Sequence, residues 1–169
     1  MDDKWGDPKT RTIEYYDPRK PARAALAMSG LEYLEAIGRG EIPAPPITAL
    51  MNMTLDSVEH GRAVFGLVPD ESLYNPIGAV HGGAICTVLD SVAGCAVHST
   101  LEAGWGYTSV EIKVNYIRGT TADSGTLTAT GWVKKGGSRI AFAEAELIDA
   151  QGRLIATATS TLLVFELRA

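Results

Sequence analysis

The chain has 169 residues, 46% of them hydrophobic and 21% charged, which is typical of one soluble globular domain and excludes two full-sized domains. Its net charge of −5, a pI near 5.2 and scattered Lys and Arg exclude the basic surface that a nucleic-acid-binding protein needs. The acidic residues 1–8 lack the basic start and apolar run of a secretory signal, and the apolar stretch 79–101 is interrupted by His81, Asp90 and His98, so we expect a cytoplasmic protein without a membrane partner.

The first 46 residues are predicted to form an N-terminal appendage in three parts. Residues 1 to about 22 are polar and show no lasting apolar period, which is typical of an arm that becomes ordered only by docking. Apolar residues then recur at helical spacing from Ala24 to Ile37, which predicts one amphipathic helix that ends at 38–40. The proline-rich segment 42–47 cannot continue that helix and is expected to be a stiff linker.

The main domain is predicted to span residues 47–169. A period of two from residue 49 onward, through Met51, Met53 and Leu55 and again through Ala63, Phe65 and Leu67, predicts a β-hairpin. A loop over 69–80 precedes the run 82–100, which is apolar nearly all round and therefore indicates a helix surrounded by protein. Four more alternating runs predict strands at 109–116, 125–134, 139–148 and 154–165. This order predicts an α+β fold in which a curved antiparallel sheet wraps one long helix.

Asp90 is the most unusual residue of the predicted buried helix. Its neighbours in the sequence are apolar, among them Val88, Leu89 and Val92. A carboxylate in such surroundings is costly to desolvate unless it is paired, hydrogen-bonded or protonated. Asp90 therefore either anchors a polar network in the core or performs chemistry.

A glycine pair lies where the loop becomes the helix. Gly82 and Gly83 follow His81, and the free backbone amides of a helix N-terminus bind a developing oxyanion well, which makes both glycines candidate substrate contacts. The alternative is that the glycines only permit a tight turn and that His81 caps the helix.

The combined spacing resembles that of a known family. The residues that carry the resemblance are Asn75, His81-Gly82-Gly83 six residues later, Asp90 nine further on, and the strand Thr108–Glu111. Over residues 47–166 the chain is similar to the hotdog-fold acyl-CoA thioesterases of the phenylacetyl-CoA (PaaI-like) type. The resemblance implies a hotdog fold, here with an extra N-terminal helix, and hydrolysis of acyl-CoA to free acid and CoA. It also implies that Asp90 is the general base or the nucleophile and that the Gly82 N–H binds the carbonyl oxygen.

The same resemblance implies roles for the remaining site residues. Asn75 and His81 would orient the thioester or the attacking water. Ser109, or alternatively Thr108, would hold the water near Asp90.

Helix geometry adds a requirement of its own. His81 and Asp90 are nine residues apart, about 13 Å if the intervening chain is helical, so one carbonyl cannot contact both within one chain. The Asp90 that serves a given His81-Gly82 turn should therefore come from a partner subunit, as in a two-fold homodimer with antiparallel central helices. The resemblance further implies that dimers pair into homotetramers.

The densest basic cluster spans residues 134–139. Lys135 and Arg139 are candidate contacts for the phosphates of CoA, and a solvated turn explains them equally well. No ligand spacing indicates a metal and no glycine loop indicates a nucleotide, so we expect neither metal nor cofactor. Two alternatives to the thioesterase stay open: a hotdog-fold enoyl- or hydroxyacyl-CoA hydratase, and a non-catalytic acyl-CoA-binding module in which Asp90 is a satisfied core residue.

Overall fold

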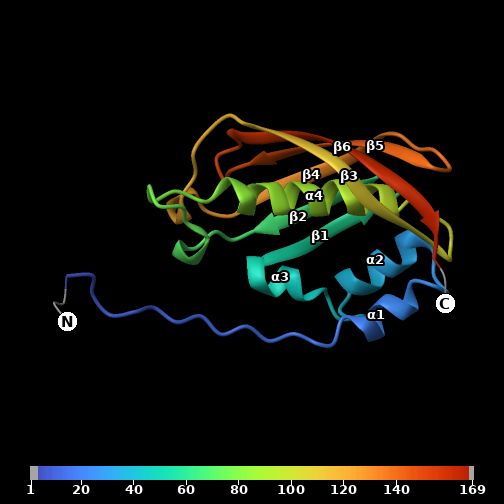
Figure 1. Ribbon diagram of the computed structural model, residues 1–169, viewed down its shortest axis with the longest axis horizontal. Helices are drawn as coiled ribbons and strands as arrows, with labels where there is room; N and C mark the ends of the chain where they lie inside the picture. Colours follow the sequence, from blue (N-terminus) through green and yellow to red (C-terminus); the bar gives the residue numbers. More distant parts are fainter. Residues whose placement is uncertain (1–3, 168–169) are drawn as a thin grey trace.

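A computed structural model describes residues 4–167 (Figure 1). Its main body is a curved six-stranded antiparallel sheet, in the order β1-β2-β4-β5-β6-β3, packed on the long helix α4 (Gly82–His98). The strands are β1 (Met53–Glu59), β2 (Arg62–Leu67), β3 (Trp105–Tyr116), β4 (Leu127–Lys135), β5 (Ile140–Ile148) and β6 (Leu154–Glu166), with short 3-10 turns at Glu71–Leu73 and Ala122–Ser124. The predicted α+β arrangement is therefore confirmed. No helix within 4–167 is long and apolar enough to cross a bilayer.

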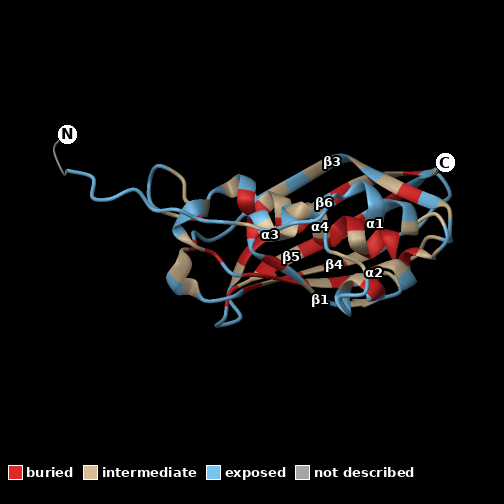
Figure 2. Ribbon diagram, turned by 90° about the horizontal axis from the view of Figure 1, so that it is seen from below, coloured by how far each residue is buried: buried red, intermediate tan, exposed pale blue. Residues whose placement is uncertain are grey.

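The core forms between α4 and the sheet face that it covers. Burial alternates along β4, β5 and β6, so every second side chain meets the helix. The largest fully buried side chains come from both layers and include Leu89, Leu127, Leu147, Ile155 and Leu162. Figure 2 shows the buried residues concentrated on α4 and on the strands that face it.

Small residues allow α4 and the sheet to approach closely. Gly131 lies in β4 opposite α4, and a Cβ atom there would come within 2.5 Å of the carbonyl oxygen of Val92. Backbone atoms cannot move aside as a flexible side chain can, so this position requires glycine as long as the helix keeps its present distance.

The N-terminal appendage differs from its prediction. The helix expected over 24–37 is wrong in its bounds: the chain forms α1 (Arg19–Ala24) and α2 (Gly30–Gly38), because Ser29 and Glu32 make a capping box that starts a new helix. Residues 46–51, expected as linker and strand, form α3 (Pro46–Met51). Pro46 fits the first helical turn, where its missing N–H is not needed, and Asn52 ends the helix with a left-handed φ of 54°.

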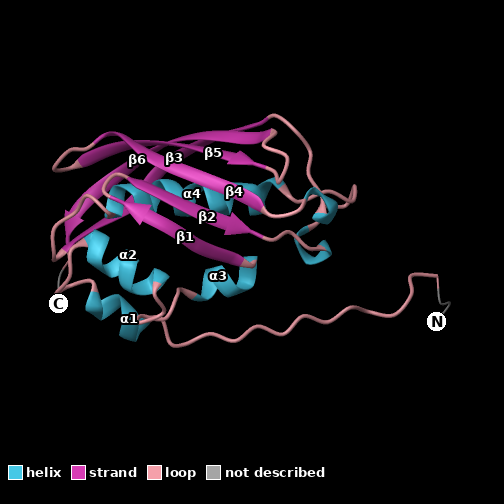
Figure 3. Cartoon of the chain, turned by 180° about the vertical axis from the view of Figure 1, so that it is seen from behind, coloured by secondary structure: helices cyan, strands magenta, loops and turns pink. Residues whose placement is uncertain are grey.

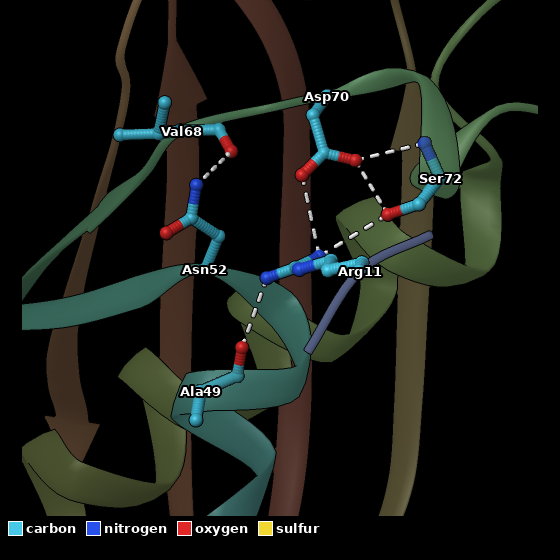
Figure 4. Close-up of polar contacts among 6 residues, drawn as sticks. All are labelled: Arg11, Ala49, Asn52, Val68, Asp70 and Ser72. Carbon is cyan, nitrogen blue, oxygen red and sulfur yellow. Dashed lines mark hydrogen bonds and ion pairs between the residues drawn. The ribbon is translucent and has the colours of Figure 1, made fainter. Parts of the chain in front are cut away.

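The described arm, residues 4–18, contacts the body through Arg11 (Figure 4). The Arg11 guanidinium donates to the carbonyl oxygen of Ala49 at 2.9 Å and to Ser72 at 3.1 Å, and it lies 3.3 Å from the Asp70 carboxylate. Lys9 forms a second ion pair, with Glu71. Arg11 thus joins the last turn of α3 to the loop that precedes the predicted site. Residues 1–3 of the predicted arm lie outside the described residues.

Helix α2 packs against the C-terminal end of α4. The Gly30 N–H donates to the carbonyl oxygen of Leu101 at 2.9 Å, and a Cβ at Gly30 would overlap the carbonyl oxygen of His98. The buried His98 ring packs nearly perpendicular to the Tyr33 ring and lies beside Tyr107. These contacts hold α2 beside β1, and the reverse view in Figure 3 shows α2 and α3 next to that strand, with α1 beyond α2.

We expect Gly131→Ala to lower the free energy of unfolding by about 1–3 kcal/mol, because the added methyl group must push α4 away from β4. Urea unfolding followed by circular dichroism measures the change. Gly136→Ala is the matched control, since a Cβ at Gly136 meets nothing within 4 Å. Equal stability of the two variants would contradict the described distance between helix and sheet.

Candidate active site

Asp90 lies halfway along α4, on a stripe of the helix that the sheet does not cover. Cys86, Thr87, Asp90 and Ser91 are only half-buried, whereas the residues on the opposite side of α4 are buried. The prediction that this helix is surrounded by protein is therefore wrong for this stripe within a single chain. The stripe opens on a cavity of about 560 Å³, which we call the carboxylate cavity, whose floor contains Asp90.

One oxygen of the Asp90 carboxyl group is held by the sheet. Ser109 in β3 donates its hydroxyl proton to Asp90 Oδ1 at 2.7 Å. Within 4–167, Oδ2 accepts no hydrogen bond and no cation pairs with the group. The nearby hydroxyls of Thr87 and Ser91 donate to backbone carbonyl oxygens of their own helix at 2.9 and 2.8 Å. Oδ2 is thus left available to a molecule in the carboxylate cavity.

A β-bulge in β3 gives Ser109 this orientation. Opposite β6, Ser109 pairs with Leu162 and Glu111 pairs with Thr161, so Val110 is an extra residue in β3. Tyr107, before the bulge, and Ile112, after it, both pack on the core. The side chains of β3 that point inward are therefore odd-numbered before the bulge and even-numbered after it. The bulge lets β3 present Ser109 to Asp90 and still bury apolar side chains beyond it.

Thr108 has the opposite orientation. It is exposed and does not line the carboxylate cavity, so the structure brings only one of the two predicted hydroxyls to Asp90. Its contact with substrate stays a prediction.

The glycine turn at the start of α4 offers one open amide. His81 caps the helix, because its Nδ1 accepts a hydrogen bond from the Gly83 N–H at 2.8 Å. The Gly83 amide, predicted to be free, is therefore occupied. The Gly82 N–H finds no acceptor in the described part of the chain and lies at the positive end of the helix dipole. A single backbone donor is thus available to bind an oxyanion here.

Asn75 shapes the loop that leads to this turn. Its side-chain oxygen accepts hydrogen bonds from the N–H groups of Ile77 and Ala79, each at 3.1 Å, and its backbone N–H donates to the Ala79 carbonyl oxygen at 2.8 Å. No described residue accepts a hydrogen bond from the side-chain amide of Asn75. The side-chain oxygen of Asn75 thus stabilises the loop, and its side-chain NH2 group is available to donate to a bound molecule.

The predicted site residues form three separate groups within one chain. Asp90 and Ser109 are in contact, and Asn75, His81 and Gly82 share the loop and the helix start. Gly82 and Asp90 are eight positions apart on one continuous helix, about 12 Å along the axis. Lys135 and Arg139 lie on the exposed β4–β5 turn, which borders Thr100 and Leu101 beyond the other end of α4.

Sequence reasoning missed several residues of the carboxylate cavity. Cys86 and Thr87 share the stripe with Asp90, and a helical projection of 82–98 would have placed them there. Ile47 lines the cavity because of the way α3 packs, and the local sequence pattern does not predict this. Among the residues described, no three His, Cys, Asp or Glu side chains gather closely enough to bind a metal ion.

The chain is similar in sequence and in fold to known thioesterases. Residues 77–156 match the family described as the thioesterase superfamily. Human acyl-coenzyme A thioesterase 13 is 32% identical over 114 residues, which cover 66% of this chain and 79% of the human protein. A solved thioesterase family protein from Silicibacter pomeroyi superimposes with a TM-score of 0.70 at 29% identity, covering 79% of this chain and 98% of its own.

The fold itself matches more distant structures. The PaaI protein of the phenylacetic acid degradation operon of E. coli superimposes with a TM-score of 0.70 at 20% identity, over 82% of this chain and 96% of that protein. At this identity the likeness concerns the fold alone, and it confirms the predicted hotdog architecture.

Proposed function

This chain belongs to the thioesterase superfamily and is homologous to acyl-coenzyme A thioesterase 13, and on that premise we propose that it hydrolyses acyl-CoA thioesters to the free acid and CoA. The observation that carries the proposal is the hydrogen bonding of the Asp90 carboxyl group. Ser109 holds one carboxyl oxygen, no residue within 4–167 donates to the other, and Asp90 lines the carboxylate cavity. A carboxylate arranged in this way can act on a molecule that enters the cavity.

In the proposed reaction the thioester carbonyl lies between Asp90 and a Gly82 N–H. Asp90 takes a proton from a water molecule that attacks the carbonyl carbon, or attacks that carbon itself. The carbonyl oxygen gains negative charge and is stabilised by the Gly82 N–H and the dipole of α4. The C–S bond then breaks, and CoA leaves as a thiolate that needs no strong acid. Where Asp90 itself has attacked, the acyl group is left on it as a mixed anhydride, which water hydrolyses to release the acid and restore the carboxylate. Asn75 and His81 orient the reacting groups from the loop.

The proposed site is shared between two subunits. Asp90 and Gly82 are about 12 Å apart along one helix, whereas a catalytic hydrogen bond needs about 3 Å. A homodimer with antiparallel α4 helices brings the Asp90 of each chain to the Gly82 of the other and creates two equivalent sites. The uncovered stripe of α4 supports this arrangement. So does β3, an outer strand of the sheet with Val110 and Tyr116 more than half exposed.

The same dimer gives the basic turn a role. Antiparallel helices place the C-terminal end of one α4 toward the N-terminal end of the other. The partner subunit's Lys135 and Arg139 would then lie on the Gly82 side of the site, where they can contact the CoA phosphates. Pairing of dimers into tetramers and a cytoplasmic location remain expectations.

We expect Asp90→Asn to lower kcat by about 10²–10⁴, because the amide neither accepts the proton nor attacks the carbonyl. Ser109→Ala should cost less, about tenfold, since it removes only the hydrogen bond that positions Asp90. Release of CoA from a panel of acyl-CoAs, followed with a thiol reagent, measures both. Asp123→Asn, in an exposed turn, is the charge-matched control. Acyl-CoA binding without release of CoA would instead indicate a binding module, and addition of water to an enoyl-CoA would indicate a hydratase.

The Gly82 donor can be removed without changing the helix. Proline lacks an N–H, is tolerated at the first helical position, and suits the extended backbone of His81, whose φ and ψ are −63° and 137°. We expect Gly82→Pro to lower kcat by about 10²–10³. Gly82→Ala is the matched control, since it introduces the same Cβ contact with the exposed Tyr116 ring and keeps the N–H. Equal losses in the two variants would remove Gly82 from the mechanism.

Mixed dimers test whether the site is shared. Asp90→Asn and Gly82→Pro chains, carrying different affinity tags, are co-expressed and purified through both tags. If each site combines the Asp90 of one chain with the Gly82 of the other, one of the two sites in the mixed dimer contains both native residues. The mixed dimer should then regain about half of the wild-type kcat. Activity no higher than that of either parent would mean that both groups act within one chain.

A further inference from the structure

A second cavity lies beside the carboxylate cavity. It has a volume of about 400 Å³, and Ile47 and Ser91 line both cavities. We call it the apolar cavity, because most of its lining is hydrocarbon, including Leu34, Met53, Leu55 and Phe65. On the α4 side it extends from Ser91 to Cys95, so it begins next to Asp90 and runs toward the C-terminal end of the helix.

The Thr and Ser hydroxyls in the lining already have acceptors within the protein. The hydroxyls of Thr48, Thr54 and Ser91 donate to Pro45, Asp56 and Thr87 at 2.7, 2.6 and 2.8 Å. At the far end the lining contains Cys95 and Tyr107, and burial raises the pKa of the Cys95 thiol to about 12, so it stays protonated. Among the residues that the structure describes, no Asp, Glu, Lys or Arg side chain lines the cavity. A charged or strongly polar ligand group would therefore lose its hydration there without gaining a partner.

The N-terminal appendage builds the outer wall of this cavity. Leu34, Ile37 and Gly38 come from the second half of α2, and Pro45, Ile47 and Thr48 come from the linker and α3. The wall is held in place at both ends. Helix α2 packs on α4 through Gly30, and Arg11 hydrogen-bonds to the last turn of α3 (Figure 4). Asn52 adds a hydrogen bond of 2.9 Å to the Val68 carbonyl oxygen.

We infer that the apolar cavity binds the acyl group of the substrate and that α2 and α3 set the length of chain it accepts. The inference rests on the proposed thioester hydrolysis. With the carbonyl at Asp90, the chain lies along α4 toward Cys95, about 8 Å further along the axis. The substrate class is therefore a CoA thioester of an uncharged hydrocarbon acid of medium chain length. Dicarboxylic acyl groups are excluded by the lack of a partner for their second carboxylate.

Two positions on α2 allow the cavity to be shortened. Ile37 is half-buried in its wall, and Ile37→Trp would extend a large ring into the space. Gly38 also lines the cavity, and a Cβ there meets nothing within 4 Å, so Gly38→Phe adds volume without a backbone clash. Glu35→Trp is the matched control, because Glu35 is exposed on the same helix and does not line the cavity.

The experiment measures kcat/KM of the full chain for butyryl-, hexanoyl-, decanoyl- and succinyl-CoA. Wild-type protein and Glu35→Trp should prefer the medium chains over succinyl-CoA by at least about a hundredfold. Ile37→Trp and Gly38→Phe should lose about tenfold or more on decanoyl-CoA and change less than about twofold on butyryl-CoA. Unchanged chain-length profiles in both variants would overturn the inference and leave the hydrolysis itself standing.

A wild-type protein that hydrolyses none of these thioesters would instead refute the proposed function. The cavity is then tested by calorimetric binding of alkyl-CoA thioethers, which cannot be hydrolysed. Wild-type affinity that rises from butyl to decyl, together with loss of that rise in Ile37→Trp and Gly38→Phe, would support the cavity as the site of the chain. Affinity independent of chain length in the wild type would overturn it.

Discussion

A carboxyl group on a largely apolar helix needs a polar partner, and the hydrogen bond from Ser109 to Asp90 supplies it. This contact requires two irregularities at once. The sheet must leave one stripe of α4 uncovered, and β3 must contain an extra residue so that Ser109 faces inward there. The cavity and the free carboxyl oxygen both follow from these two features. The proposed chemistry therefore depends on a local departure from an otherwise regular sheet.

The rest of the molecule positions this contact. Gly131 lets β4 lie against the backbone of α4, and Gly30 lets α2 lie against its C-terminal end. The helix is thus fixed on two sides while its polar stripe stays open. The appendage adds the wall of the apolar cavity, with Arg11 joining α3 to the loop at Asp70 and Ser72. Parts of the chain that are distant in sequence therefore meet around Asp90.

The strands, the central helix and Asp90 could be predicted because each has a strong local signal. Period-two alternation identified the strands from residue 53 onward, and an acid among apolar neighbours identified Asp90. The appendage was harder, because 24–37 has helical spacing throughout and only the capping box at Ser29 divides it. Residues 49–51 alternate like a strand although they complete the helix that Pro46 starts. The occupied Gly83 amide and the cavity lining depend on side-chain packing, which a one-dimensional pattern does not contain.

The cap at the start of α4 also fixes the state of its imidazole. Because Nδ1 of His81 accepts the Gly83 N–H, the neutral ring must carry its hydrogen on Nε2. The exposed edge of the ring is then a hydrogen-bond donor, directed away from the helix. The turn that presents the Gly82 amide therefore offers a second N–H donor, from the same side chain that caps the helix.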